Sequence, residues 1–392
     1  MKQILVLNNA KSSNLTVLIH TFIFVDLLFF PRLMFAFGVP ISLFIILIDF
    51  CFRPLPSKRL LIAIGLLVLM LCSVLYGAAT GQNLAPDESL KRAIQLFTIL
   101  LYSFFRFDTE NVRPILVKVL RCFYVWTFGT MLLFYLQPGI YQQVMAMIYP
   151  ESLDQLENNL DILRFAYFFS DPNSAAYLIC FTFVGYLSIE RKLNWGIVCS
   201  TMAIMCILAT QSRGAYVAAA VILLYFSSSL KVPRYKKLLV IISSCLVLWT
   251  LVLFYSEEVK QAYSIFDARF DQEEDLGGGR SSKYKYFLEN FNFMPIGSGY
   301  HLQKEGAEFR PHSDLIRINL SYGFLALPLL LYFVLPRRKS QVLLFLVFIA
   351  PFLINTVIDD YRLLGTYLLL FGILGQVDGR STTNKAKQKP VS

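Results

Sequence analysis

Long apolar runs alternate with short polar connections along almost the whole chain. Each run is close to the roughly 20 residues that a helix needs to cross a bilayer. The runs lie at about residues 15–30, 33–52, 59–77, 91–107, 116–136, 172–189, 193–209, 213–229, 236–256, 313–335, 341–358 and 362–377. This pattern predicts an all-α polytopic membrane protein with about twelve transmembrane helices.

The composition supports this fold class. Of the 392 residues, 56% are hydrophobic and only 16% are charged, whereas soluble domains carry about 25% charged residues. The mean hydropathy is +0.57. These values exclude a soluble enzyme, a disordered chain and a nucleic-acid binder, even though the formal net charge is +10.

Lysine and arginine gather in every second connection, while acidic residues predominate in the others. The basic connections lie near residues 2–11, 53–59, 106–118, 191–192, 231–237, 337–339 and 380–389. Because cytoplasmic loops carry the excess of Lys and Arg, both termini are predicted to be cytoplasmic. The first run lacks the short apolar core and cleavage site of a signal peptide, so we expect it to remain in the mature protein.

The connections divide the chain into four predicted segments. Residues 1–256 hold transmembrane helices 1–9, 257–312 form one long outer loop, 313–377 hold helices 10–12, and 378–392 form a cytoplasmic tail. Structureless loops longer than about 15 residues are uncommon in compact proteins and usually functional or disordered. We therefore expect residues 257–312 to fold as a lid.

Arginines collect at the outer helix ends and in the long loop, on the side that is otherwise acidic. They are Arg92, Arg164, Arg213, Arg280, Arg310, Arg317 and Arg362. The planar, permanently charged guanidinium group suits bidentate binding of phosphate, which favours a site for a lipid diphosphate. The alternative is that these side chains extend to the interface and contact lipid headgroups.

Asp171 and Asn173 flank Pro172 at the predicted start of a helix. Aspartate at the N-cap followed by proline is ordinary helix-start chemistry. A capped helix start can also direct backbone N–H groups at an anion. Both interpretations remain open from the sequence.

His312 lies at the outer mouth of the tenth apolar run, close to Asp314 and Arg317. Histidine titrates near neutral pH and can accept a proton from a sugar hydroxyl. His301 is an alternative for this role. The sequence has no HExxH, Walker, paired-cysteine or DxD-like motif, so we expect chemistry without a metal or cofactor.

Four short stretches in this order resemble the bacterial O-antigen ligase and O-antigen polymerase family. They are the segment from Arg164 to Ala176, Gln211–Tyr216 around Arg213, Gly279-Arg280 with Pro295–Gly299, and His312 with ten residues before Gly323. The resemblance covers residues 160–335, and Val217 stands where the family often has leucine. Each motif is short, but their order and predicted side make a specific signal.

The resemblance implies a metal-independent glycosyltransferase at the periplasmic face of the inner membrane. Such enzymes transfer a glycan from an undecaprenyl-diphosphate carrier to an acceptor hydroxyl. By position, Arg213 and Arg280 would hold the diphosphate, His312 would orient or deprotonate the acceptor, and Arg164, Asp171, Asn173, Arg310 and Arg317 would bind substrate.

Three functions remain open at this point. The first is a polysaccharide polymerase for O-antigen, capsule or exopolysaccharide, for which we also consider a chain-length regulator as a partner. The second is an O-antigen ligase whose acceptor is the lipid A core. The third, from another class, is a lipid-linked oligosaccharide flippase or transporter. The third is disfavoured because the polar residues gather at one face and no internal repeat is visible, whereas transporters bind near the midplane.

Overall fold

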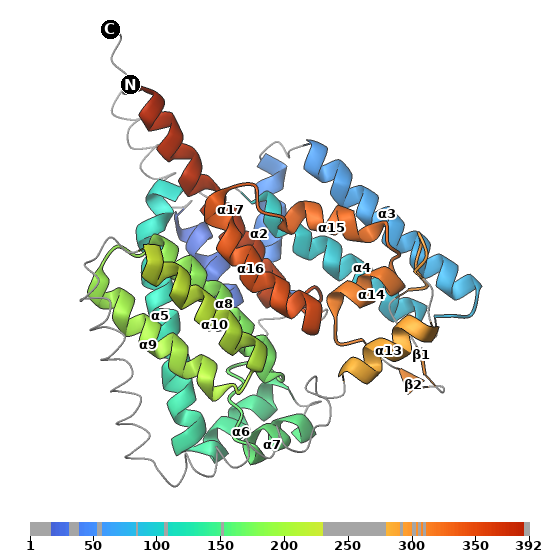
Figure 1. Ribbon diagram of the computed structural model, residues 1–392, viewed down its shortest axis with the longest axis horizontal. Helices are drawn as coiled ribbons and strands as arrows, with labels where there is room; N and C mark the ends of the chain where they lie inside the picture. The colour runs from blue at the N-terminus through green and yellow to red at the C-terminus, as the bar shows by residue number, and fades with distance from the viewer. Residues whose placement is uncertain are drawn as a thin grey trace. The chain divides into compact units, whose positions relative to one another are not determined.

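A computed structural model describes residues 17–30, 39–52, 57–83, 85–105, 109–149, 153–229, 280–290, 293–299, 303–304, 307–308 and 311–387. This part of the chain is helical (Figure 1), apart from a hairpin of two two-residue strands. Strand β1 (Gln303–Lys304) pairs antiparallel with β2 (Ala307–Glu308). The all-α fold class is therefore confirmed for the described residues except at this hairpin.

The contacts divide the chain into two compact units. Unit 1 comprises Met1–Val119 and Ser282–Ser392, and unit 2 comprises Leu120–Ser281. The boundaries fall inside α5 (Thr109–Leu136) and near the start of α13 (Arg280–Asn290). The division into four segments that the sequence predicts is not tested by these units and remains a prediction.

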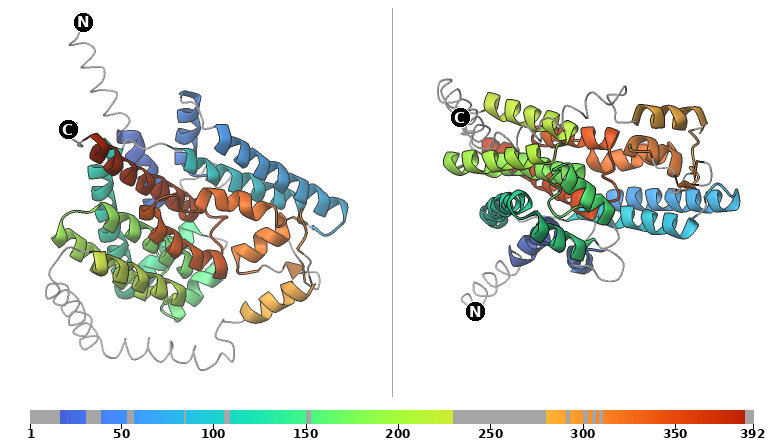
Figure 2. Two further views of the ribbon diagram at one scale, coloured as in Figure 1. Left: turned by 45° about the horizontal axis from the view of Figure 1, so that its top comes forward. Right: turned by 90° about the horizontal axis from the view of Figure 1, so that it is seen from below.

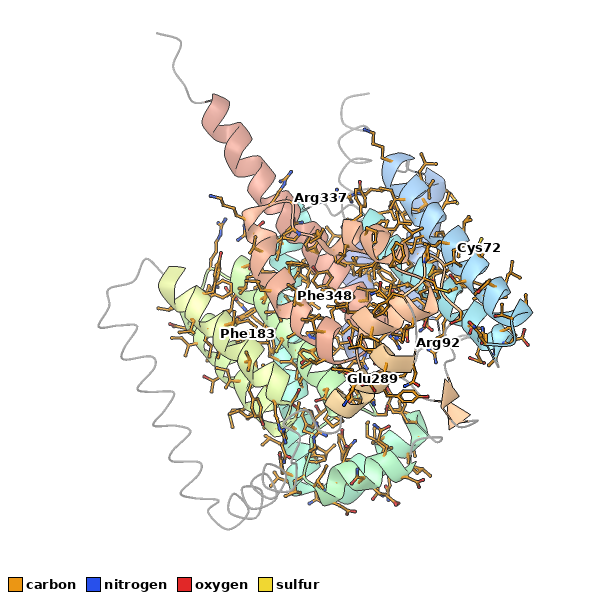
Figure 3. The ribbon with its side chains drawn as sticks, turned by 45° about the vertical axis from the view of Figure 1, so that its right-hand side comes forward. Cys72, Arg92, Phe183, Glu289, Arg337 and Phe348 are labelled. Atoms are coloured by element: carbon orange, nitrogen blue, oxygen red, sulfur yellow. The ribbon has the colours of Figure 1, made fainter. Side chains whose placement is uncertain are left out.

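Unit 1 is built on helices from both ends of the chain. Its helices are Val17–Phe29, α2 (Ile41–Phe52), α3 (Ser57–Ala79), α4 (Pro86–Leu100), η1 (Leu101–Phe104), α14 (Asp314–Ser321), α15 (Ala326–Val334), α16 (Lys339–Ile354) and α17 (Tyr361–Lys387). Helix α3 runs alongside α4 and α15, and α16 lies alongside α17 and α14 (Figures 1 and 2). Helices distant in sequence thus pack together in unit 1. Phe348 of α16, labelled in Figure 3, is 1% exposed and packs against Tyr367 of α17.

Unit 2 packs three apolar helices together. They are α8 (Pro172–Ile189), α9 (Leu193–Ala209) and α10 (Arg213–Ser229). Helix α8 contacts both of the others and is buried along nearly its whole length, with Phe183 at 0% exposure (Figure 3). Before them, α6 (Pro138–Ile148) and α7 (Leu153–Asp161) pack against each other.

An ion pair joins the middle of α5 to the end of α8 in unit 2. The Glu190 carboxylate accepts hydrogen bonds from Arg121 Nε at 2.8 Å and from the Tyr186 hydroxyl at 3.0 Å. Burial alone would raise the pKa of Glu190, but the Lys192 N–H, Arg121 and Tyr186 together lower it below its usual range. Glu190 is therefore held ionised in the connection after α8.

Three helices of the described part are long and apolar enough to span a bilayer: Lys58–Ala79, Val112–Leu136 and Pro172–Ile189. Five more apolar helices, among them Leu193–Ala209 and Lys339–Ile354, are 10–17 residues long. These helices are consistent with a polytopic membrane protein, while the number of twelve spans and the orientation remain predictions. The predicted span 236–256 lies outside the described residues.

The run at 313–335, predicted as one span, is two helices instead. Helix α14 ends at Ser321 and α15 begins at Ala326. Between them Gly323 has a φ of +88°, a left-handed conformation that costs a residue with a Cβ about 1–2 kcal/mol. Hydropathy alone misses this break, because the residues around Gly323 are apolar.

The loop at 293–299, which carries the motif Pro295–Gly299, docks onto this break. Backbone N–H groups of Ser298 and Gly299 donate to the carbonyls of Leu320 at 3.1 Å and Ser321 at 2.8 Å. The Ser73 hydroxyl of α3 accepts from the N–H of Gly297 at 3.2 Å. A Cβ on Gly297 would overlap the backbone of Ser321. Gly297 therefore allows close backbone contact between the loop and α14.

Gly323→Ala is expected to destabilise unit 1. The new Cβ would overlap the Pro295 carbonyl and occupy a left-handed conformation, which alone costs about 1–2 kcal/mol. Thermal unfolding in detergent should show a lower melting temperature. Gly196→Ala in α9, where no atom lies within 4 Å of the added Cβ, is the matched control. Equal melting temperatures for both variants would contradict this account of Gly323.

Candidate functional site

The described site residues form two groups, one in each unit. In unit 2, the segment from Ile162 to Asp171 is an irregular loop between α7 and α8. Tyrosine hydroxyls of the preceding segment hold it, because Tyr141 donates to the carbonyl of Tyr167 at 2.6 Å and Tyr149 to that of Phe168 at 2.8 Å. The loop is thus fixed by side chains from outside it.

Backbone strain concentrates at this loop. Among the described residues, the non-glycine residues with positive φ are Leu163 at 51°, Tyr167 at 49° and Gln211 at 51°. Two of them lie in the loop, and the Gln211 side-chain amide donates to the Ile162 carbonyl at 3.1 Å. Such conformations cost about 1–3 kcal/mol each and cluster at functional sites. Their position favours a functional role for the loop together with the turn before Arg213.

Arg164 contacts both neighbouring elements of this region. Its Nε donates to the carbonyl of Thr210 at 3.2 Å, and one terminal nitrogen donates to Asn173 Oδ1 at 3.3 Å. The side chain is half-buried. Arg164 therefore lies against the turn that leads into Arg213, which the sequence did not indicate.

Asp171 is the N-cap of α8. Its carboxylate accepts from the backbone N–H groups of Asn173 and Ser174, both at 3.1 Å, and from the Asn173 amide at 3.0 Å. The N-cap interpretation is therefore confirmed. Since these N–H groups are bound by Asp171, the further role of the cap is to orient Asn173, which in turn contacts Arg164.

Arg213 is the first residue of α10 and is half-buried. The preceding turn is rigid: the Ser212 N–H donates to Thr210 Oγ1 at 3.3 Å, and the Ser212 carbonyl accepts from the Tyr216 N–H at 3.0 Å. Helix N-termini carry a partial positive charge. In unit 2, the Arg164 side chain thus contacts the turn that leads directly into Arg213 at the N-terminus of α10.

In unit 1, His312 is exposed and directly precedes α14. Its neighbour Ser313 caps the helix, with its hydroxyl 3.4 Å from the N–H of Ile316. The Asp314 N–H donates to the Asn355 carbonyl at 3.1 Å, and the Asp314 carboxylate accepts from Val357 and Ile358. The backbone at His312 is therefore joined to the connection between α16 and α17.

Arg317 forms a buried ion triad with Asp314 and Asp359, which strengthens the attachment of α14 to this connection. One terminal nitrogen of Arg317 lies 2.5 Å from Asp314 Oδ1, and the other lies 2.6 Å from Asp359 Oδ2. The Arg317 side chain is only 3% exposed. The sequence predicts that Arg317 binds substrate, but the structure places both terminal nitrogens against carboxylates of the protein. Arg317 accordingly supports the His312 segment.

Asp359 was not identified from the sequence. It lies in the short connection 355–360, where an Asp-Asp pair between two apolar runs was the available signal. The next residue, Asp360, caps α17 by accepting from the N–H groups of Arg362 at 2.7 Å and Leu363 at 3.0 Å. Burial raises the pKa of Asp360, although the Arg362 charge lowers it in part.

Arg317→Met is expected to lower the free energy of unfolding by about 3–5 kcal/mol, because it leaves buried carboxylates without their cation. Thermal or chemical unfolding in detergent measures the change. Lys91→Met, which removes an exposed pair with Glu88 whose side chains are 69% and 46% exposed, should cost only about 0–1 kcal/mol. Adding Asp314→Asn to Arg317→Met should recover part of the loss, and wild-type stability of Arg317→Met would contradict the role of the triad.

The side chains of the other predicted site residues lie outside the described part of the structure. Arg280 is the first residue of α13, but its side chain is not described, and Arg310 and His301 lie outside the described residues. No group of three or more His, Cys, Asp or Glu that could hold a metal ion occurs in the described part of the chain. Metal independence remains a prediction.

Comparison with known families identifies the class of protein. The family described as O-antigen ligase matches residues 197–331, a segment that contains Arg213, Arg280, His312 and Gly323. This match over part of the chain supports the resemblance of its motifs to the O-antigen ligase and polymerase family. No curated protein was found to match the chain.

Proposed function

We propose that this chain transfers a glycan from an undecaprenyl-diphosphate-linked donor to an acceptor sugar hydroxyl, at the periplasmic face of the bacterial inner membrane. The observation that carries the proposal is the family match over residues 197–331, which spans the motifs of Arg213, Arg280 and His312. The family indicates activity of the ligase or polymerase type. We propose beyond this that the carrier is undecaprenyl diphosphate and that transfer takes place at the periplasmic face of the inner membrane.

In this reaction the acceptor oxygen forms a bond to the anomeric carbon of the donor glycan while the bond from that carbon to the diphosphate oxygen breaks. His312 accepts the proton of the acceptor hydroxyl. Arg164, Arg213 and Arg280 bind the diphosphate and stabilise the charge that it gains on leaving. Asp171 and Asn173 support Arg164, and Arg310 is a further candidate to contact the donor.

Among the acceptors, we propose a growing glycan, so that the protein acts as a polysaccharide polymerase. The specific observation that favours the second candidate, an O-antigen ligase, is the description of the matched family. The two activities differ in the acceptor hydroxyl and share the chemistry of the donor. The lipid bilayer is a partner of either enzyme, since its apolar helices expose large side chains such as Leu61 and Leu75.

The test is to reconstitute the purified protein in liposomes with a lipid-linked repeat unit and no ion gradient, and to offer lipid A core as a separate acceptor. Longer lipid-linked glycans support the polymerase, whereas glycan attached to lipid A core supports the ligase. A deletion strain that accumulates lipopolysaccharide capped by a single repeat agrees with the polymerase. Absence of any transfer, with movement of the lipid-linked glycan across the bilayer, would overturn the proposal in favour of a flippase.

A further inference from the structure

We propose that Tyr284 is a positioning residue for His312 and that its hydroxyl couples this histidine to α13. The proposal rests on the proposed function, in which His312 accepts the proton of the acceptor. Tyr284 belongs to neither the sequence motifs nor the predicted site. Its phenol lies at the corner where α13, α16 and the start of α14 meet within unit 1.

The contacts of the Tyr284 hydroxyl define this role. It donates to the backbone carbonyl of His312 at 2.9 Å and lies 3.4 Å from the carbonyl of Leu353, in the last turn of α16. The His312 carbonyl belongs to the peptide bond just after the histidine Cα. Holding this peptide plane restricts the backbone from which the exposed imidazole extends.

Asp314, two residues after His312, is held by a different set of contacts. The Asp314 N–H and carboxylate bind the connection 355–360, and Arg317 links Asp314 to Asp359. The backbone from His312 to Asp314 therefore has one anchor on the connection and a second anchor on Tyr284. Only the second anchor comes from α13.

Helix α13 is itself packed onto α14. Phe287 and Leu320 are buried against each other, with Tyr286 and Ile316 packed around them, and the two helices lie next to each other in Figure 1. Helix α13 begins at Arg280, one turn before Tyr284. A helix that starts at a predicted diphosphate-binding arginine is thus hydrogen-bonded to the residue predicted to act on the acceptor.

The expected size of the effect follows from geometry. Loss of one hydroxyl at the edge of a helix leaves the apolar packing of α13 in place, so the fold should persist. A displacement of about 1 Å at a reacting group, in contrast, can cost about 10²-fold in rate. Tyr284 should therefore affect the rate of transfer much more than the stability of the protein.

The test compares Tyr284→Phe with Tyr286→Phe, which makes the same chemical change on the same helix. Transfer is measured in liposomes as kcat and as KM for the lipid-linked donor, together with the melting temperature. We expect Tyr284→Phe to lower kcat about 10- to 100-fold, with a donor KM within about twofold and a melting temperature close to that of Tyr286→Phe. Tyr286→Phe should have wild-type kcat.

A double-mutant cycle separates positioning from a merely structural role. If Tyr284 acts through His312, Tyr284→Phe should cause no further loss of the residual rate in a His312→Ala background. Wild-type kcat of Tyr284→Phe, or losses that multiply in the double variant, would overturn this inference while leaving the proposed function intact. Wild-type activity of His312→Ala would instead overturn the assignment of His312, on which the inference rests.

Discussion

Replacing His312 by alanine is expected to lower the rate of glycan transfer by about 10²–10⁴-fold, the contribution of a positioned general base. The imidazole is exposed, and its backbone is anchored by Tyr284 and by the connection 355–360. A residue so fixed at the mouth of a helix can reach a bound acceptor. The melting temperature should change little, since the imidazole is on the surface.

The measurement is transfer by the reconstituted protein, with binding of the lipid-linked donor measured separately. We expect His312→Ala to bind the donor as the wild type does and to fail in transfer. His301→Ala is the matched control, because it removes the other histidine of the long loop. If His301→Ala loses transfer and His312→Ala retains it, the two residues exchange roles. If both retain it, neither is the general base.

Much of the helical framework could be predicted from hydropathy. The runs 172–189, 193–209 and 213–229 coincide with α8, α9 and α10, because Asp171-Pro172 and polar turns mark their ends. The hydropathy pattern missed α6, which is apolar on average but only 11 residues long, and α7, which is polar on average, and it joined α14 to α15. Both errors have one cause. Average hydropathy reports burial, whereas the ends of these helices depend on turn geometry and on contacts with distant residues.

The candidate site, like the fold, could be predicted only in part from the sequence. Residue type and motif order predicted Arg164, Asp171, Arg213 and His312, and the N-cap role of Asp171 follows from local spacing alone. The burial of Arg317 could not be predicted, because its second partner, Asp359, is 42 positions away in the sequence. Tyr284 acts through a backbone carbonyl, which leaves no side-chain pattern. Motifs identify groups that carry charge, but they do not show which charges are already neutralised inside the protein.

Replacing Arg213 by alanine is expected to lower kcat about 10²–10³-fold, the cost of removing a charged group that stabilises a leaving anion. Arg213 is half-buried at the start of α10, and the turn before it is fixed by Thr210, Gln211 and Ser212. Because the charge on the diphosphate increases as the glycosidic bond breaks, loss of the arginine should affect kcat more than donor binding. Arg213→Lys should restore only part of the rate, since a lysine lacks the planar fork.

Arg191→Ala is the matched control, because it removes an exposed arginine from the connection after α8 in the same unit. It should transfer glycan at the wild-type rate. Arg164→Ala provides the finer test of the mechanism. Arg164 already donates to Thr210 and Asn173, so its removal should loosen the turn before Arg213 as well as remove a charge. If Arg164→Ala and Arg213→Ala both retain wild-type kcat, these two arginines do not bind the diphosphate, and Arg280 and Arg310 become the candidates for the donor site.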